Sequence, residues 1–223
     1  MTKAVIFDMY ETLVTLYGTP TYFGAQMAQD AGIEEARFRA TWDAAEADRS
    51  TGRLTLEEVL ERILRENGRY SMSRLERMVE KRVRYKEEAF EHMHGGIIPL
   101  MEALRARGMR IGLISNCFSE ESAVIRRSVL YPYFDAVCLS FDEGVKKPDP
   151  AIFRRCLQRL DVQPGECLYV GDGGSGELEA ARQLGMQPVQ AAWYLKEGTH
   201  QPCGRKAEFM QLETPMDVLS VLG

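Results

Sequence analysis

The chain has 223 residues, of which 45% are hydrophobic and 27% are charged. This length and apolar content are enough for one large domain, or for two smaller ones, with a buried core. The net charge of −5 argues against a general affinity for nucleic acids or anionic membranes. No apolar run approaches the ~20 residues of a membrane-spanning helix, so we expect no association with a membrane.

The cysteines and the first residues of the chain bear on its cellular location. The five cysteines are an odd number, widely spaced and without a C-x-x-C pair, which is typical of reduced thiols in buried positions. The chain passes from Met1-Thr2-Lys3 directly into an apolar run, without the pattern of a signal peptide. We therefore expect a cytoplasmic protein.

The first predicted strand is the apolar run of residues 4–7, which ends at Asp8. A short apolar run bounded by polar residues is typical of a strand buried on both faces in a parallel sheet. An acid at the carboxyl end of such a strand lies where open α/β sheets bind their ligands. By itself this signal is weak, because an Asp after a strand also serves as a turn residue or a helix cap.

Residues from about 21 to 94 show helical periodicity and little strand character. The predicted helices cover about residues 21–31, 34–49, 55–67 and 73–90. Thr55 and Glu58 fit a capping box at the start of the third helix. Four consecutive helices without an intervening strand predict a small four-helix bundle. Three arginines of this segment are interpreted as exposed charges on the helix faces: Arg49, Arg53 and Arg69.

From Gly95 onward, predicted helices and strands alternate. The later strands are expected at about residues 110–114, 136–140, 167–170 and 188–193. A strand, a helical insert and then repeated helix–strand units imply an α/β fold with a doubly wound parallel sheet. We expect a Rossmann-like core of residues 1–16 and 95–223, with residues 17–94 forming a helical cap domain.

Polar residues follow four segments of the predicted sheet, where the strands end. They are Asp8, Ser115-Asn116, Lys146-Lys147, and Asp172 with Glu177. Because the carboxyl ends of parallel strands meet at one edge, we expect these side chains to converge. Carboxylates there can hold Mg²⁺, a lysine and small donors can bind phosphoryl oxygens, and a carboxylate can act as a covalent nucleophile.

These segments resemble the four motifs of the haloacid dehalogenase superfamily of hydrolases, and the helical insert resembles the C1 cap of its subfamily I. The matching segments, in order, are Asp8-x-Tyr10-x-Thr12-Leu13, Leu113-Ile114-Ser115-Asn116, Gly144–Phe153, and Tyr169-Val170-Gly171-Asp172 with Glu177. One such motif is a weak signal, whereas four in order at suitable spacing are highly specific. The resemblance covers essentially the whole chain.

The resemblance implies a role for each motif residue. Asp8 would be the nucleophile that forms an aspartyl intermediate, Ser115 would bind an oxygen of the transferring group, and Lys147 would neutralise Asp8. Mg²⁺ would be held by Asp8, Asp172 and the backbone carbonyl of Tyr10, and Glu177 would support its water shell. Thr12 stands in the first motif and Asn116 in the second, so the resemblance also implies catalytic roles for them. Asn116 could equally cap the helix that follows it.

The chain departs from the superfamily's phosphatases at Tyr10. By the resemblance, the first motif of these phosphatases is D-x-D-x-T, and its second Asp serves as general acid and base. Tyrosine, with a pKa of about 10, is a poor base at neutral pH, and losing a tuned acid/base costs ~10²–10⁴-fold in rate. Dehalogenases of the family carry a tyrosine there but lack the metal residues that Asp172 and Glu177 preserve. Glu11 could substitute as the acid, but we favour the cap or a water.

The expected function is a Mg²⁺-dependent phosphatase acting on a small phosphorylated metabolite, with the usual general acid replaced by Tyr10. Two alternatives stay open: a metal-independent 2-haloacid dehalogenase, and a weakly active or non-catalytic binding member of the family. We expect a small-molecule partner, no nucleic acid and no membrane, and either a monomer or a homodimer. The sequence does not name the substrate, because the cap that selects it follows no motif.

Overall fold

The described part of the chain, residues 1–18, 20–195 and 203–222 of a computed structural model, forms a six-stranded sheet in the order β3-β2-β1-β4-β5-β6. Every neighbouring pair of strands is parallel. The strands are β1 Ala4–Phe7, β2 Arg110–Ser115, β3 Ala136–Leu139, β4 Cys167–Gly171, β5 Gln187–Ala191 and β6 Met210–Leu212. The α/β class and the doubly wound parallel sheet predicted from the sequence are confirmed.

Strand β1 lies inside the sheet and is buried on both faces. Val5 and Phe7 belong to one hydrophobic cluster, together with residues of α6 (Ile97–Ala106) and α7 (Ser119–Arg127). Ala4 and Ile6 belong to a second cluster, together with residues of α9 (Pro150–Leu160) and α10 (Glu177–Gln183). Successive side chains of a strand point to opposite faces, so the helices cover the sheet on both sides. This burial explains why residues 4–7 are uniformly apolar.

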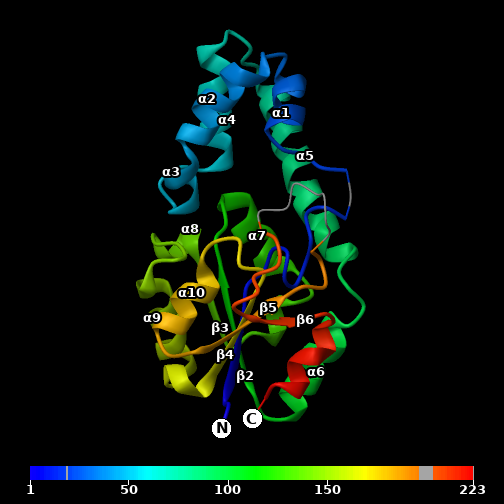
Figure 1. Cartoon of the computed structure of the whole chain (residues 1–223). Helices are drawn as coiled ribbons and strands as arrows, with labels where there is room; N and C mark the ends of the chain where they lie inside the picture. The colour runs from blue at the N-terminus through cyan, green and yellow to red at the C-terminus, as the bar shows by residue number, and fades with distance from the viewer. Residues whose placement is uncertain (19, 196–202, 223) are drawn as a thin grey trace.

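In the described residues, five helices between β1 and α6 stand above the carboxyl ends of the strands, and we call these helices the helical part (Figure 1). They are α1 Gly24–Ala31, α2 Glu35–Ala44, α3 Glu46–Ser50, α4 Leu56–Glu66 and α5 Met72–Glu91. Their apolar faces form a core of their own. The capping box at the start of α4 is confirmed, with the Thr55 amide donating to Glu58 Oε2 at 2.8 Å. The domain limits at residues 16/17 and 94/95 stay a prediction.

The predicted helix over residues 34–49 is two helices. The backbone leaves the helical path at Ala45 (φ −87°, ψ 0°), and α3 then runs toward the short helix α8 (Ser140–Glu143) of the sheet-containing part. This turn buries Arg49, whose residue exposure is 2%. The interpretation of Arg49 as an exposed charge is therefore wrong, whereas Arg53 and Arg69 are exposed as expected.

The remaining elements are short. The 3₁₀ helices are Tyr131–Tyr133, Pro164–Glu166 and Pro215–Ser220. Neither the last of these nor β6 has an apolar pattern long enough to identify from the sequence. Among the described residues, no helix combines the length and the apolar character that crossing a membrane requires.

Candidate active site

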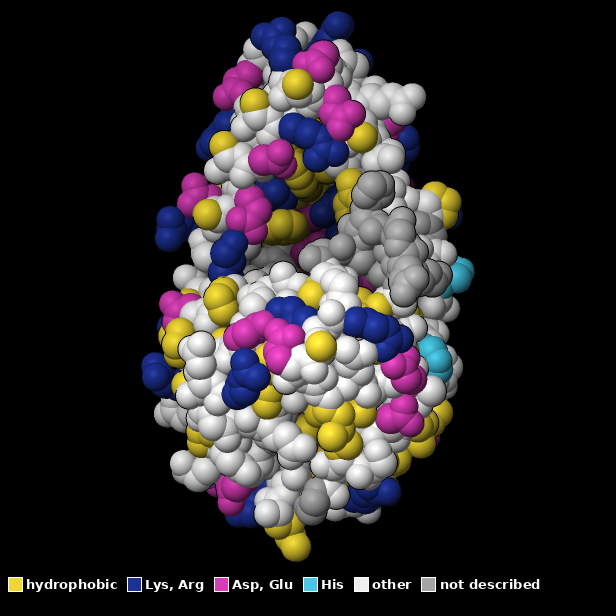
Figure 2. Space-filling model, in the orientation of Figure 1, with side chains coloured by type: hydrophobic (Ala, Val, Ile, Leu, Met, Phe, Trp, Pro, Cys, Tyr) yellow, Lys and Arg dark blue, Asp and Glu magenta, His cyan; other side chains and the backbone are white. Residues whose placement is uncertain are grey.

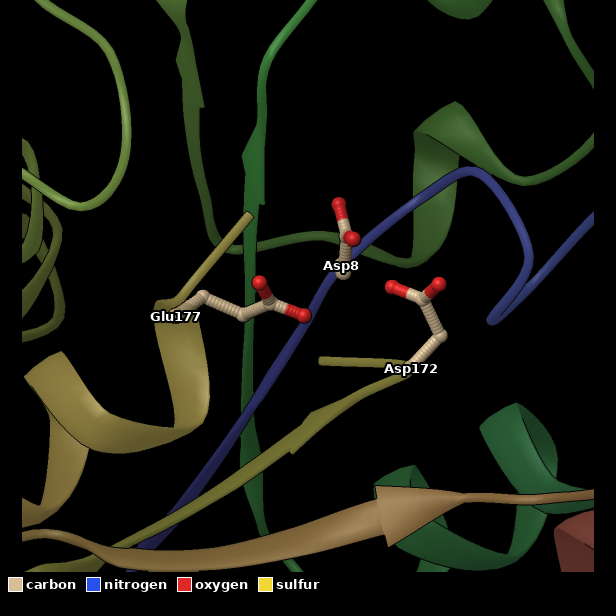
Figure 3. A group of neighbouring side chains, drawn as sticks. All are labelled: Asp8, Asp172 and Glu177. Atoms are coloured by element: carbon tan, nitrogen blue, oxygen red, sulfur yellow. The ribbon is translucent and has the colours of Figure 1, made fainter. Parts of the chain in front are cut away.

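Four side chains from separate segments meet at the carboxyl edge of the sheet. Asp8 directly follows β1, Asp172 directly follows β4, Glu177 opens α10, and Lys147 lies in the loop before α9. The carboxylates of Asp8, Asp172 and Glu177 offer oxygen atoms that all lie within 4.8 Å of one another. Figure 3 shows these three side chains pointing toward a common centre. The structure thus brings these predicted residues together at one edge of the sheet.

Asp8 and Lys147 form a buried ion pair, with Lys147 Nζ 2.6 Å from Asp8 Oδ1. Burial raises the pKa of Asp8 to about 6, although the charge of Lys147 opposes this rise. Burial alone would lower the pKa of Lys147, but the carboxylates of Asp8 and Glu177 raise it above its ordinary value. At neutral pH the pair therefore holds an ionised carboxylate beside a permanent cation, as a nucleophilic carboxylate needs.

Asp172 and Glu177 bring more negative charge than Lys147 balances. Burial, followed by the charges of Glu177 and Asp8, raises the pKa of Asp172 to about 8. Its Oδ2 atom is buried and makes no hydrogen bond with the described residues. Buried charges in proteins are normally paired or bound to a metal. An all-oxygen set of three carboxylates with an unpartnered oxygen fits a hard cation such as Mg²⁺.

Glu177 also shapes the loop that follows β4. Its Oε1 accepts a hydrogen bond from the Gly173 amide at 2.6 Å, and its Oε2 accepts one from the Ser175 amide at 2.7 Å. The Gly174 amide donates to Asp172 Oδ1 at 3.1 Å. Residues 173–175 thus wrap around the two acids and fix their carboxylates relative to each other.

Asn116 contacts Lys147 through both ends of its side-chain amide. Its Oδ1 accepts from the Lys147 amide at 2.7 Å, and its Nδ2 donates to the Lys147 carbonyl at 3.0 Å. The N-cap of α7 is Phe118, so the alternative in which Asn116 caps this helix is wrong. The amide instead holds the backbone of the lysine that pairs with Asp8.

A cavity of about 140 Å³ opens onto Asp8. Its wall contains Asp8, Tyr10, Glu11, Leu16, Asn116, Lys147, Asp172, Gly174 and Ser175. Ser115 and Thr12 are fully buried but do not belong to this wall. The Ser115 hydroxyl lies 3.4 Å from the Asn116 carbonyl, and the Thr12 carbonyl accepts a hydrogen bond from Trp193 Nε1 at 2.8 Å. Four of the six predicted catalytic residues thus line the cavity, and Ser115 and Thr12 do not.

Tyr10 and Glu11 have environments that bear on proton transfer. The Tyr10 hydroxyl is buried without a hydrogen-bond partner among the described residues. Burial and the charge of Glu121 raise the pKa of Tyr10 well above its usual value. Glu11 accepts hydrogen bonds from Thr15 Oγ1 and from the Leu16 amide, both at 2.8 Å. Its carboxylate therefore holds the loop after β1, a role that the sequence did not indicate.

A second, larger cavity of about 780 Å³ lies between the helical part and the sheet, and Leu16 belongs to the walls of both cavities. Figure 2 shows the molecule hollowed at this level, with charged and hydrophobic side chains on the wall. Arg82 and Lys86 of α5 are buried here against Glu120 and Glu121 of α7. Sequence reasoning missed this cluster. Its signal was the pair of basic residues at four-residue spacing between Met78 and Phe90, on the apolar stripe of α5.

The comparisons with known proteins define the class. Residues 2–185 match the haloacid dehalogenase-like hydrolase family, so the chain belongs to this family and is a hydrolase. The resemblance inferred from the four motifs is therefore confirmed.

Two curated relatives share one name. A glyceraldehyde 3-phosphate phosphatase from Methanopyrus kandleri is 25% identical over 245 residues, covering 100% of this chain and 97% of the relative. A protein of the same name from Pyrococcus abyssi is 35% identical over 88 residues, covering 39% of this chain and 37% of the relative.

The similar solved structures include both chemistries of the family. A haloacid dehalogenase-type phosphatase from Thermococcus onnurineus has a TM-score of 0.70 at 24% identity, covering 100% of this chain and 98% of its own. A 2-haloacid dehalogenase from Pseudomonas syringae pv. Tomato DC3000 has a TM-score of 0.68 at 23% identity, with the same coverage of both chains. At these identities the likeness establishes the fold and does not distinguish the two reactions.

Proposed function

We propose that the protein is a Mg²⁺-dependent phosphatase that acts on a small phosphorylated metabolite through an aspartyl-phosphate at Asp8. The observation that carries this proposal is the convergence of Asp8, Asp172 and Glu177 beside Lys147. A metal-independent reaction gives no reason to bury three carboxylates against one lysine. The names of the two curated relatives support phosphoryl chemistry as well.

In the proposed reaction, a carboxylate oxygen of Asp8 attacks phosphorus and the ester bond to the leaving alcohol breaks. Lys147 keeps Asp8 ionised and balances charge on the transferring group, and Asn116 positions Lys147. Water then cleaves the phosphoryl group from Asp8, which restores the carboxylate. Asp172, Asp8 and the Tyr10 carbonyl would hold Mg²⁺, which when bound neutralises carboxylate charge and polarises phosphoryl oxygens.

Proton transfer is the step in which this site differs from the pattern with a second aspartate. The Tyr10 hydroxyl is a very weak acid in its buried position, and the carboxylate of Glu11 is engaged by the loop after β1. We therefore assign the proton that the leaving alcohol needs to water or to a group of the helical part. The enzyme should therefore favour phosphate esters whose leaving alcohol is acidic and needs little protonation.

Phosphate release from p-nitrophenyl phosphate, whose leaving group needs little protonation, tests the proposal. We expect release with Mg²⁺, loss of release in excess chelator, recovery when Mg²⁺ is restored, and no activity in Asp8→Asn. Asp161→Asn is the matched control, because Asp161 is an exposed aspartate at the end of α9. Unchanged release in chelator, or in Asp8→Asn, would refute the proposed mechanism.

A 2-haloacid dehalogenase is the second candidate, and Tyr10 is the observation that favours it. Departure of a halide needs no proton, so a neutral buried phenol in place of an acid costs that reaction nothing. In this case Asp8 would attack carbon and displace halide, without a metal. Halide release from 2-chloropropionate in chelator would support this candidate. Absence of both activities across a broad substrate panel would favour the binding member of the family.

A further inference from the structure

Arg49 lies in the wall of the larger cavity, where the helical part faces the sheet. The residue is 2% exposed, and its guanidinium makes no ion pair with any described residue. Its Nε and Nη1 atoms are buried without hydrogen-bond partners, and Nη2 donates only to the Trp42 carbonyl at 3.3 Å. Leaving a buried donor unsatisfied costs free energy, more so when the donor is charged.

Two aromatic rings contact this guanidinium. Its central carbon lies 3.7 Å from the centroid of the Trp42 ring and 4.1 Å from that of Phe118. Trp42 belongs to α2 of the helical part, and Phe118 precedes α7 of the sheet-containing part. Contacts with the two rings stabilise the cation. They restrain its orientation while leaving the donors of Nε and Nη1 unused, so Arg49 is ordered before any ligand arrives.

The buried charges around the cavity do not balance. Arg82 pairs with Glu120 at 3.0 Å, and Lys86 pairs with Glu121 at 2.6 Å. The two carboxylates are thus matched by two cations, and Arg49 is left over. Burial lowers the pKa of Arg49 to about 10, which keeps the guanidinium charged at neutral pH. The cavity wall therefore carries one buried guanidinium that forms no ion pair with a described residue, because the nearby Glu120 and Glu121 are engaged by Arg82 and Lys86.

The position of the surplus charge relates to the proposed reaction. The larger cavity adjoins the one at Asp8, and Leu16 belongs to both walls. A phosphate ester held at Asp8 would extend its leaving group past Leu16 toward Arg49. A volume of about 780 Å³ is within the range of sites that bind small organic molecules.

We propose that Arg49 binds an anionic group on the leaving alcohol, so that the substrates are phosphate monoesters of hydroxy carboxylic acids. This inference rests on the proposed phosphatase function and specifies its substrate class. Arg49 acts as a specificity-determining residue: a carboxylate supplies the acceptors that Nε and Nη1 lack and an ion-pair partner for the guanidinium. A neutral leaving group of the same size would leave the cation buried and unpaired.

Equilibrium binding separates this inference from turnover. Isothermal titration calorimetry would use the Asp8→Asn chain with Mg²⁺ and phosphate monoesters of straight-chain hydroxy acids of increasing length. Each acid would be compared with its own primary amide, which keeps size and hydrogen bonding but removes the charge. We expect the acid to bind at least about tenfold more tightly than the amide at one or more lengths, as for a hydrogen-bonded charge pair.

Variants assign the preference to Arg49. Adding Arg49→Met to Asp8→Asn should abolish the preference for the acid, and adding Arg49→Lys should retain part of it. Arg53→Met is the matched control, because Arg53 is exposed and pairs with Asp48 outside the cavity wall. If Arg49→Met does not fold, the acid–amide comparison and Arg49→Lys still decide.

The possible outcomes are distinct. Equal binding of acid and amide at every length, no binding of any ester, or a preference that survives Arg49→Met would overturn the assignment of Arg49. The wild-type chain could instead bind the acid more tightly than the amide but release no phosphate. This outcome would contradict the proposed phosphatase function and would still support Arg49 as an anion-binding residue.

Discussion

The proposed nucleophile, Asp8, belongs to a small group of residues that hold one another in place. Asp8 pairs with Lys147, and Asn116 holds the backbone of Lys147 through two hydrogen bonds. Around this pair, Asp172 and Glu177 add negative charge that a metal-free site leaves unbalanced. Without a bound cation, this unbalanced negative charge should lower the stability of the folded chain, and the pH dependence of stability measures this effect.

The unbalanced carboxylates predict how stability depends on pH in chelator. The folded state raises the pKa of Asp172 to about 8 and that of Asp8 to about 6. From about pH 4 to 6 the folded chain retains both protons while the unfolded chain has lost them, and from about pH 6 to 8 the folded chain retains only the proton of Asp172. Stability therefore falls as pH rises through both ranges. Asp172→Asn should flatten this fall and raise the metal-free melting temperature at pH 8 by roughly 2–4 °C or more.

Thermal scans with and without Mg²⁺ provide the measurement. Mg²⁺ should raise the melting temperature of the wild type at pH 8 and should raise that of Asp172→Asn much less. A wild-type protein whose metal-free stability increases steadily from pH 5 to pH 8 would contradict this account of the carboxylates.

Asn116 predicts a kinetic effect through Lys147. Asn116→Ala should lower kcat by roughly 10–100-fold, as expected for a small misplacement of a reacting group. Because Lys147 holds down the pKa of Asp8, the acid limb of the pH–rate profile should also move to higher pH. Asn67→Ala, at the end of α4, is the control and should leave both unchanged. A purely structural role for Asn116 would lower stability and leave the acid limb in place.

Tyr10 predicts a dependence on the leaving group. Tyr10→Asp places a carboxyl group in the wall of the cavity at Asp8, where burial favours its protonated form. Phosphate release from alkyl esters should therefore increase by up to ~10²-fold, with little gain for p-nitrophenyl phosphate. Tyr10→Phe should be close to neutral, because the hydroxyl has no hydrogen-bond partner among the described residues. A large loss of activity in Tyr10→Phe would show that the phenol does take part.

At the scale of elements, α5 and α7 join the helical part to the sheet through buried ion pairs. Arg82 Nη1 also donates to the Tyr22 carbonyl at 2.8 Å, so this side chain links α5 to two other segments, the one around Tyr22 and α7. The glutamates lie in the first turn of α7, where the helix dipole favours negative charge. These ion pairs hold the helical part in its position relative to the sheet.

This contact predicts a large effect of a single substitution. Arg82→Met leaves Glu120 buried without its partner and should lower the free energy of unfolding by roughly 3–5 kcal/mol. Adding Glu120→Gln should recover part of the loss. Arg84→Met, on the same helix but with an exposed pair to Glu88, should change urea unfolding little. Equal effects of the Arg82 and Arg84 substitutions would show that the buried pairing does not stabilise the fold.

Elements also show how far the sequence predicts the structure. Apolar runs and their terminal acids identify the strands and place Asp8 and Asp172 at one edge, because both signals are local. The burial of Arg49, Arg82 and Lys86 was not predicted, since it depends on contacts with α7 and α8 that lie far away in the chain. A basic residue on a helix is usually solvated, and only tertiary packing reveals the exceptions. The motif residues were therefore predictable, whereas the residues of the larger cavity were not.

At the scale of the whole molecule, the proposed reaction site and the proposed recognition cavity are formed by different parts of the fold. The sheet and its loops provide Asp8, Lys147 and the acidic cluster, while α1–α5 cover them from above (Figure 1). The cavity between these parts is where the leaving group would lie. The central claim is that Asp8 accepts a phosphoryl group at this junction.

The most direct test is mass spectrometry of the chain quenched with acid during a single turnover of p-nitrophenyl phosphate with Mg²⁺. The account predicts that the peptide containing Asp8 gains the mass of one phosphoryl group. It also predicts that this gain is absent in chelator and in Asp8→Asn. Release of phosphate without any modification of Asp8 would contradict the account, as would an organic acid joined to Asp8 when a 2-haloacid is supplied without metal.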